Sequence, residues 1–296
     1  SLGSGLALLG ASGIASSLSA EEIRKFNPRP LAGPIRLGSN ENPYGPSEKM
    51  RQAMVNAFDN GCRYPWAYNS SLVKMIAEKE GVPENYIVPV AGSTEGLKVA
   101  GITFGRGGEI ISCAPTFLSM MEYAELWGTE INWVPLNKDL DFDLEEIEKR
   151  VSHETRLVFL CNPNNPTGKL LPAQKVMDFC ETVSKRAVVF SDEAYYDYIT
   201  EPNYPSMVEL VKKGHDVVVS RTLSKVYGLA GIRLGYLIAK PELADKLKDR
   251  VVANTNIMAI EAGKAALMDK EFYQFALQKN KEAKALLTQT LDELKL

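Results

Sequence analysis

The chain has 296 residues, of which 45% are hydrophobic and 24% are charged. These fractions are ordinary for a globular protein, and the length suffices for one large domain and part of a second. The formal net charge is −3, so no overall positive field attracts nucleic acid or an anionic membrane. Any anion must therefore be bound by a local site.

The first 20 residues are small and apolar, reading LGSGLALLGASGIASSLSA after Ser1. This composition of residues 1–20 is typical of the apolar part of an export signal, with small residues at 17–20 that suit cleavage, and equally of a flexible arm. Both interpretations stay open, and the first predicts an exported protein. The glycines and serines argue against a membrane span. Residues 28–46 are rich in proline, glycine and asparagine, which predicts an extended arm within the segment 21–60.

Between residues 86 and 239, short apolar runs alternate with segments of helical periodicity. The predicted strands are 86–90, 109–113, 130–135, 157–160, 187–191, 216–220 and 235–239. The predicted helices are 93–104, 117–127, 143–151, 172–185 and 208–213. Strands this apolar, separated by helices, predict an α/β fold in which a mostly parallel sheet is covered on both faces. Ligands of such sheets bind beyond the carboxyl ends of the strands, so polar residues there are the candidates for function.

The last helical pattern runs from residue 270 to residue 296, where the sequence stops. A helix owes most of its stability to the surface on which it packs. We therefore expect a further C-terminal segment after this helix.

The motif AGSTEG, Ala91 to Gly96, joins a predicted strand to a predicted helix. Gly92 permits a tight turn, and the backbone N–H groups of Ser93 and Thr94 lie at the positive end of the helix dipole. That combination is an anion site. The alternative is an ordinary helix start, with Glu95 placed favourably in the first turn.

Two more motifs follow strand ends. CNPNNPTG, Cys161 to Gly168, contains prolines and asparagines that favour a non-helical turn and direct amide side chains into the crevice. An ordinary turn is the alternative. SDEAYYDY, Ser191 to Tyr198, places Asp192 at the end of a buried strand, where an unpaired carboxylate is costly and needs a cationic partner. Tyr195 lies three residues further along.

The last motif is SRTLSKVYGLAGIRLGY, Ser220 to Tyr236. Thr222, Ser224 and Lys225 follow a strand, and Arg233 lies eight residues after the lysine. A lysine in a crevice can lose its proton and form a Schiff base with an aldehyde, and hydroxyls with a guanidinium suit a phosphate dianion. A solvated loop is the alternative for this motif alone, but four motifs at strand ends together favour one site.

Cysteines and histidines offer no metal site. The four cysteines lack a CxxC pair and are predicted to be buried thiols: Cys62, Cys113, Cys161 and Cys180. The two histidines lie among charged residues and cannot build a metal cluster. A GxGxxG run after a first strand, which a nucleotide-dependent dehydrogenase needs, does not occur.

Together these motifs resemble the fold-type I aminotransferases of class I/II, which use pyridoxal 5′-phosphate (PLP). The motifs that carry the resemblance, from about Gly38 to Asp249, are SNENPYGPS, RYP, AGSTEG, CNPNNPTG, SDEAYYDY and SRTLSKVYGLAGIRLGY. They are most similar to the histidinol-phosphate aminotransferase branch. The resemblance implies a large three-layer domain at 61–250, and a smaller α+β domain from 21–60 and 251–296 that is incomplete here. It also implies a homodimer with shared active sites and, by family default, a cytoplasmic location.

The resemblance further implies transamination between an L-amino donor, with histidinol phosphate favoured, and 2-oxoglutarate. The catalytic residues would be Lys225, which forms the Schiff base and shuttles the proton, Asp192 at the pyridinium nitrogen, and Tyr195. Asn165 and Tyr195 would bind the ring's 3-oxygen, and Phe117 would stack on the ring. The phosphate ligands would be Ser93, Thr94, Thr222, Ser224 and Arg233, with Tyr64 reaching the neighbouring subunit's phosphate. Asn40 would line the substrate side, and no metal is implied.

Departures from the family pattern concern the substrate. Trp66 follows the RYP motif where an acidic residue is common, and the arm at 27–33 lacks the tyrosine often found there. The family's substrate arginine belongs to a C-terminal segment that follows the last residue of this sequence. An aminotransferase for aromatic amino acids, or a PLP decarboxylase or C–S lyase, therefore remains an alternative. A PLP-binding regulator would need a basic DNA-recognition segment, and none is visible.

Overall fold

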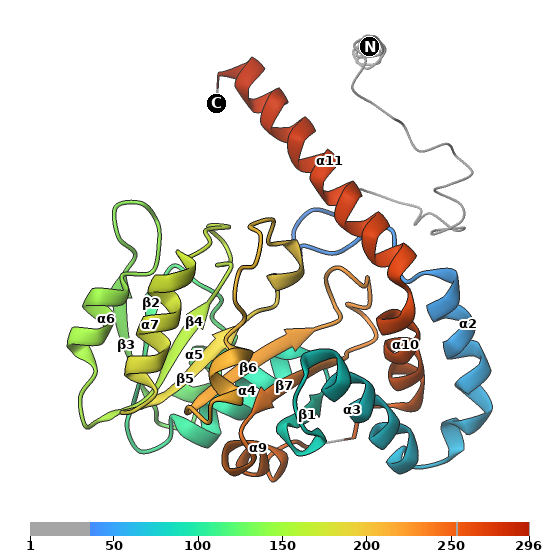
Figure 1. The fold of residues 1–296 in the computed structure, drawn as a ribbon, viewed down its shortest axis with the longest axis horizontal. Helices are drawn as coiled ribbons and strands as arrows, with labels where there is room; N and C mark the ends of the chain where they lie inside the picture. The colour runs from blue at the N-terminus through green and yellow to red at the C-terminus, as the bar shows by residue number, and fades with distance from the viewer. Residues whose placement is uncertain (1–35, 253, 296) are drawn as a thin grey trace.

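The computed structural model of the chain describes residues 36–252 and 254–295. The signal-like segment 1–20 and the beginning of the arm lie outside these residues. The centre of the molecule is a seven-stranded sheet in the order β1-β7-β6-β5-β4-β2-β3 (Figure 1). Its strands are β1 (Ile87–Val90), β2 (Glu109–Ala114), β3 (Glu130–Pro135), β4 (Thr155–Cys161), β5 (Val188–Asp192), β6 (Val217–Thr222) and β7 (Gly235–Ala239).

The sheet is parallel except at β7, which runs antiparallel to both β1 and β6. The predicted strands are confirmed, each within two residues of the observed limits. The prediction succeeds best for the inner strands, which are buried on both faces: every residue of β6 and β7 is buried. Continuous apolar runs are what such strands require.

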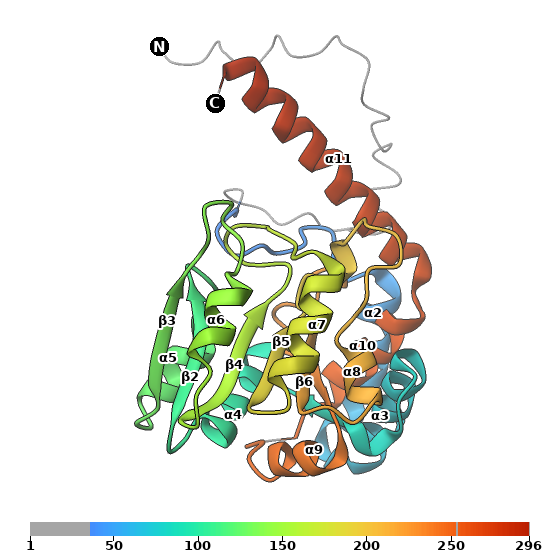
Figure 2. The same cartoon turned by 60° about the vertical axis from the view of Figure 1, so that its left-hand side comes forward.

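Helices cover both faces of the sheet. The chain forms α2 (Glu48–Ala57), α3 (Trp66–Glu80), α4 (Ser93–Phe104), α5 (Ser119–Glu125), α6 (Leu144–Arg150), α7 (Ala173–Val183), α8 (Val208–Lys212), α9 (Pro241–Lys248), α10 (Ile257–Met268) and α11 (Lys270–Leu294). One layer contains α4 and α5, and the opposite layer contains α6, α7 and α8 (Figure 2). The predicted three-layer α/β fold is confirmed. The predicted start of α5 at residue 117 is wrong by two residues, because Phe117 and Leu118 belong to the preceding loop.

The remaining helices gather beside β1, where α10 packs on α2 and α3. Asp269 joins the starts of α11 and α2: its carboxylate accepts hydrogen bonds from Ser47 Oγ at 2.7 Å and Lys49 Nζ at 2.9 Å. Beyond this anchor α11 extends away from the sheet (Figure 1). The domain limits at residues 60 and 250 stay predictions. Among the described residues, no helix is both long and apolar enough to cross a membrane.

The N-terminal arm crosses over the loop that follows β6. Asn42 Nδ2 donates a hydrogen bond to Val226 O at 2.9 Å. Gly45 and Gly228 meet backbone to backbone, so that a Cβ on Gly228 would lie 2.6 Å from the Cα of Gly45. Gly228 also has a φ of +67°, which disfavours other residues. These contacts fix the arm above Lys225.

Replacing Gly228 by alanine should therefore loosen the arm as well as strain the turn. Gly107→Ala is a matched control, because Gly107 has a φ of +79° with open space around its Cβ position. We expect the control to lose about 1–2 kcal/mol of unfolding free energy from strain alone. Gly228→Ala should lose about 1–3 kcal/mol more from the collision. Urea unfolding of both variants measures the difference, and equal losses would show that the arm does not depend on this contact.

Candidate active site

Lys225 lies in the loop after β6, beneath the N-terminal arm. Its Nζ donates hydrogen bonds to the main-chain oxygens of Ser39 at 3.1 Å and Asn40 at 3.3 Å. The same atom lies 5.6 Å from the ring centroid of Tyr195. Burial lowers the pKa of Lys225, and the carboxylates of Glu41 and Asp192 oppose this without reversing it. A lysine of lowered pKa is more often neutral, which is the form that attacks an aldehyde.

Tyr195 connects the arm to the loop after β5. Its hydroxyl accepts a hydrogen bond from Asn40 Nδ2 at 3.0 Å. Asn40 adopts a left-handed backbone conformation with a φ of 51°, which asparagine tolerates better than most residues. The structure thus brings together three of the predicted site residues, Lys225, Tyr195 and Asn40, from segments far apart in the sequence.

Asp192 is the last residue of β5 and is 2% exposed. Burial raises its pKa to about 7, and the neighbouring Glu193 adds to this. Its Oδ1 accepts a hydrogen bond from Ala194 N at 3.3 Å. Among the described residues it forms no ion pair within 4.0 Å. A buried carboxylate in this state gains most from a cationic N–H group, so it fits the protonated ring nitrogen of PLP.

A candidate phosphate cradle forms where α4 begins. Gly92 precedes the helix with a φ of +81°, and a Cβ there would collide with the Arg233 guanidinium. The guanidinium therefore lies against the backbone that leads into Ser93 and Thr94. A Cβ on Gly235 would in turn lie 2.8 Å from Ser93 N, so the start of β7 touches the same turn. A helix N-terminus beside a guanidinium is suited to a phosphate group.

Thr222 and Ser224 line the same corner. Thr222 is paired with Gly235 in the sheet, which places it next to the cradle. Its hydroxyl donates to Ser224 Oγ at 2.9 Å and accepts from Ser224 N at 3.1 Å. Both side chains are buried. Apart from Tyr64, the predicted phosphate ligands therefore lie at or next to the end of β6, the start of β7 and the start of α4.

The loops after β2 and β4 border the site beside Asp192. Asn162 N donates to the main-chain oxygen of Asp192 at 3.0 Å, so the loop after β4 starts beside this residue. Thr116 Oγ1 donates to Asn164 Oδ1 at 2.8 Å and ties the two loops together. Phe117 and Asn165, each half-buried, follow these anchors. Their contacts with the ring stay predictions.

Tyr64 lies apart from this cluster. It is 77% exposed and stacks on Trp66, with ring centroids 5.7 Å apart. Val55 and Phe58 are exposed nearby along the chain. These exposed side chains are compatible with a subunit contact, and the role of Tyr64 at a neighbouring site stays a prediction.

Some features could not be found from the motifs. The main-chain oxygens of Ser39 and Asn40 are such a case, because a carbonyl contact has no side-chain signature. The thiol prediction is correct for Cys113, Cys161 and Cys180 and wrong for Cys62, which is exposed in the 3₁₀ turn η1 (Phe58–Cys62). That turn links two helices at the surface, away from the sheet. Among the described residues, no group of three or more His, Cys, Asp or Glu side chains could hold a metal ion.

Comparison with known proteins gives a consistent result. The profile of the family described as aminotransferase class I and II matches residues 32–296. A histidinol-phosphate aminotransferase 1 from Bacillus cereus is 36% identical over 250 residues, covering 84% of this chain and 67% of the relative.

Two solved structures are also similar. One is a candidate histidinol-phosphate aminotransferase from Erwinia carotovora atroseptica, with 27% identity and a TM-score of 0.84 over 89% of this chain and 78% of that one. The other is the histidinol-phosphate aminotransferase from Sinorhizobium meliloti in complex with PLP, with 25% identity and a TM-score of 0.76 over 91% of this chain and 75% of that one.

The buried carboxylate of Asp192 should make the cofactor-free protein sensitive to pH. Because the pKa of Asp192 is raised to about 7 in the folded protein, its protonated side chain contributes to the unfolding free energy at low pH. This contribution is lost as the pH rises through about 7. Asp192→Asn mimics the protonated form, so its unfolding free energy should match the wild type near pH 4 and exceed it above pH 7 by up to about 4 kcal/mol.

Urea unfolding of cofactor-free protein at both pH values measures this difference. Asp178→Asn, on the exposed face of α7, is the matched control for replacing an aspartate by an asparagine. A pH-independent difference for Asp192→Asn would contradict the assigned state of the carboxylate.

Proposed function

The chain belongs to the aminotransferase class I and II family, and we propose that it transfers the amino group of histidinol phosphate to 2-oxoglutarate. It is a PLP-dependent aminotransferase. The observation that carries the site assignment is the position of Lys225 Nζ, held by two main-chain oxygens beside Tyr195. The choice of amino donor is supported by the histidinol-phosphate aminotransferase from Bacillus cereus, which is 36% identical.

The cofactor supplies an aldehyde for amine attachment and an electron-poor ring that accepts the electron pair left when the Cα–H bond breaks. In this proposal Lys225 would bond the cofactor's aldehyde carbon, and its amine would carry the proton between the substrate Cα and C4′ of the cofactor. Its lowered pKa favours the neutral amine, which is the form that a base requires. Asp192 would be ionised beside the ring nitrogen and would keep that nitrogen protonated.

The other residues hold and orient the cofactor. Tyr195 and Asn165 would donate to the 3-oxygen, and Phe117 would pack against the ring. Ser93, Thr94 and the α4 dipole would bind the phosphate together with Thr222, Ser224 and Arg233. Asn40 in the arm would face the substrate. Its bond to the Tyr195 hydroxyl links the substrate side to the cofactor side.

A homodimer with shared sites is part of the proposal. It is supported by the exposure of Val55, Phe58, Tyr64 and Trp66, which lie close together in the sequence, since exposed large apolar side chains that gather on a surface often mark protein contacts. Tyr64 would reach the phosphate bound by the partner.

The first prediction concerns the attachment point. Borohydride reduction of the PLP-loaded protein, followed by peptide mass mapping, should place the pyridoxyl group on Lys225. Lys225→Ala should abolish turnover and labelling but keep part of the non-covalent affinity for PLP. Lys169→Ala, in the exposed part of the loop after β4, is the matched control and should label normally. A label on any other lysine of the wild type refutes the assignment.

The second prediction concerns the donor. The amino-transfer half-reaction, followed by the absorbance of bound PLP, should be fastest with histidinol phosphate. Histidinol, which differs only in lacking the phosphate, should be slower in kcat/KM by roughly 10–100-fold, the effect of losing one or two charge-assisted hydrogen bonds. A preference for an aromatic amino acid would refute the substrate while leaving the cofactor site intact. Release of carbon dioxide from an amino acid substrate, without amino transfer, would favour a decarboxylase.

The third prediction concerns the shared site. In mixed dimers of Lys225→Ala and Tyr64→Phe chains, one site has both native residues and the other has neither. Such dimers should recover about half of the wild-type activity, and each parent homodimer should be weaker. A fully active monomer in solution would contradict the shared site.

A further inference from the structure

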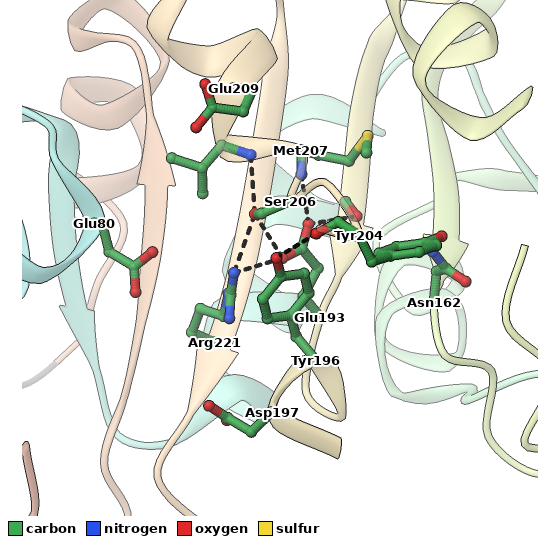
Figure 3. Close-up of polar contacts among 12 residues, drawn as sticks. Glu80, Asn162, Glu193, Tyr196, Asp197, Tyr204, Ser206, Met207, Glu209 and Arg221 are labelled. Atoms are coloured by element: carbon green, nitrogen blue, oxygen red, sulfur yellow. Dashed lines mark hydrogen bonds and ion pairs between the residues drawn. The ribbon is translucent and has the colours of Figure 1, made fainter. Parts of the chain in front are cut away.

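A buried ion pair lies between the ends of β5 and β6. Arg221 Nη2 and Glu193 Oε2 are 2.8 Å apart, and the two side chains are 6% and 3% exposed. Figure 3 shows the carboxylate and the guanidinium facing each other from these neighbouring segments. Neither residue is among those proposed to touch the cofactor or the substrate.

The pair is held on several sides. Ser206 Oγ accepts from Arg221 Nη2 at 3.0 Å and donates to Glu193 Oε2 at 2.8 Å, and Met207 N donates to Glu193 Oε1 at 2.8 Å. The guanidinium also lies 4.0 Å from the ring centroid of Tyr196. These directed contacts restrict the geometry of the pair.

Its position in the sequence connects it to the cofactor site. Glu193 directly follows Asp192, and Arg221 directly precedes Thr222. Glu193 N donates to Ser220 O at 3.0 Å, so the ladder between the two strands continues past Asp192. Because successive side chains of a strand point to opposite faces, the pair lies on the reverse side of the sheet from Asp192 and Thr222.

We infer that Glu193 and Arg221 are positioning residues that set the spacing between Asp192 and Thr222. The inference rests on the proposed assignment of Asp192 to the ring nitrogen of PLP and of Thr222 to its phosphate. A rigid cofactor spans both contacts, so a shift of one strand end relative to the other weakens at least one of them. The ion pair joins the end of β5 to the end of β6 through side chains, on the face of the sheet that the cofactor would not touch.

A merely stabilising role is a weaker account, because burying an ion pair costs about as much desolvation as its attraction returns. The residues around the pair also make it possible to neutralise Glu193 without leaving the Arg221 guanidinium buried and unpaired. Burial works against the ionisation of Glu80, yet Arg221 and Lys79 hold its pKa below the usual value. Arg221 therefore keeps a second carboxylate nearby when Glu193 is neutralised.

The test compares Glu193→Gln and Arg221→Lys with the control Asp269→Asn. Asp269 is also a buried, ion-paired carboxylate that joins two elements, but it lies at the start of α11. Three quantities are measured for each: the Kd of PLP for the cofactor-free protein, the pH at which the absorbance of bound PLP changes, and the urea midpoint of the cofactor-free protein. Arg221→Lys keeps the buried positive charge and serves as the second variant if Glu193→Gln does not fold.

We expect both site variants to raise the Kd of PLP at least about tenfold and to move the absorbance transition by about one pH unit. The control should lose stability with both cofactor readouts unchanged. Variants that unfold at lower urea but keep the wild-type Kd and absorbance transition would overturn the inference and leave the proposed function standing. A wild type that does not bind PLP would overturn the proposed function, and this inference with it.

Discussion

The burial of one carboxylate, that of Asp192, is the constraint on which the site depends. Its strand, β5, lies between β4 and β6 in the sheet, so water is excluded from its end and ionisation is costly there. A cationic N–H group at the same place removes that cost. In the proposed reaction the ring nitrogen would be that group, and the carboxylate would in turn keep the nitrogen protonated.

The neighbouring strands supply the other requirements from either side. The loop after β4 starts beside Asp192 and leads to Asn165, and the loop after β6 carries Lys225. The cradle of Arg233 and the α4 N-terminus lies next to Thr222 because β7 pairs with β6 there. The arm completes the site from outside the sheet, through the main-chain oxygens that hold Lys225. In the proposed site, the ring nitrogen, the aldehyde and the phosphate would meet groups whose spacing is determined by the sheet.

Much of this arrangement could be predicted from the sequence, because it depends on local patterns. Apolar runs located all the strands, and α4 begins and ends at the predicted residues Ser93 and Phe104. The start of α4 can be predicted because Gly92 marks the turn between β1 and the helix. What the sequence could not show are contacts between distant segments, such as Gly45 against Gly228 or Glu193 against Arg221. Such contacts leave no periodicity, and they emerge only once the topology places the segments together.

The most direct test of the central claim is the protonation state of the ring nitrogen itself. PLP labelled with ¹⁵N at that position is bound to the wild type and to Asp192→Asn, and its chemical shift is followed with pH. The account predicts a protonated nitrogen in the wild type at every pH at which the protein stays folded, and an unprotonated one in the variant. An unprotonated nitrogen in the wild type, or the same titration in both proteins, would contradict it.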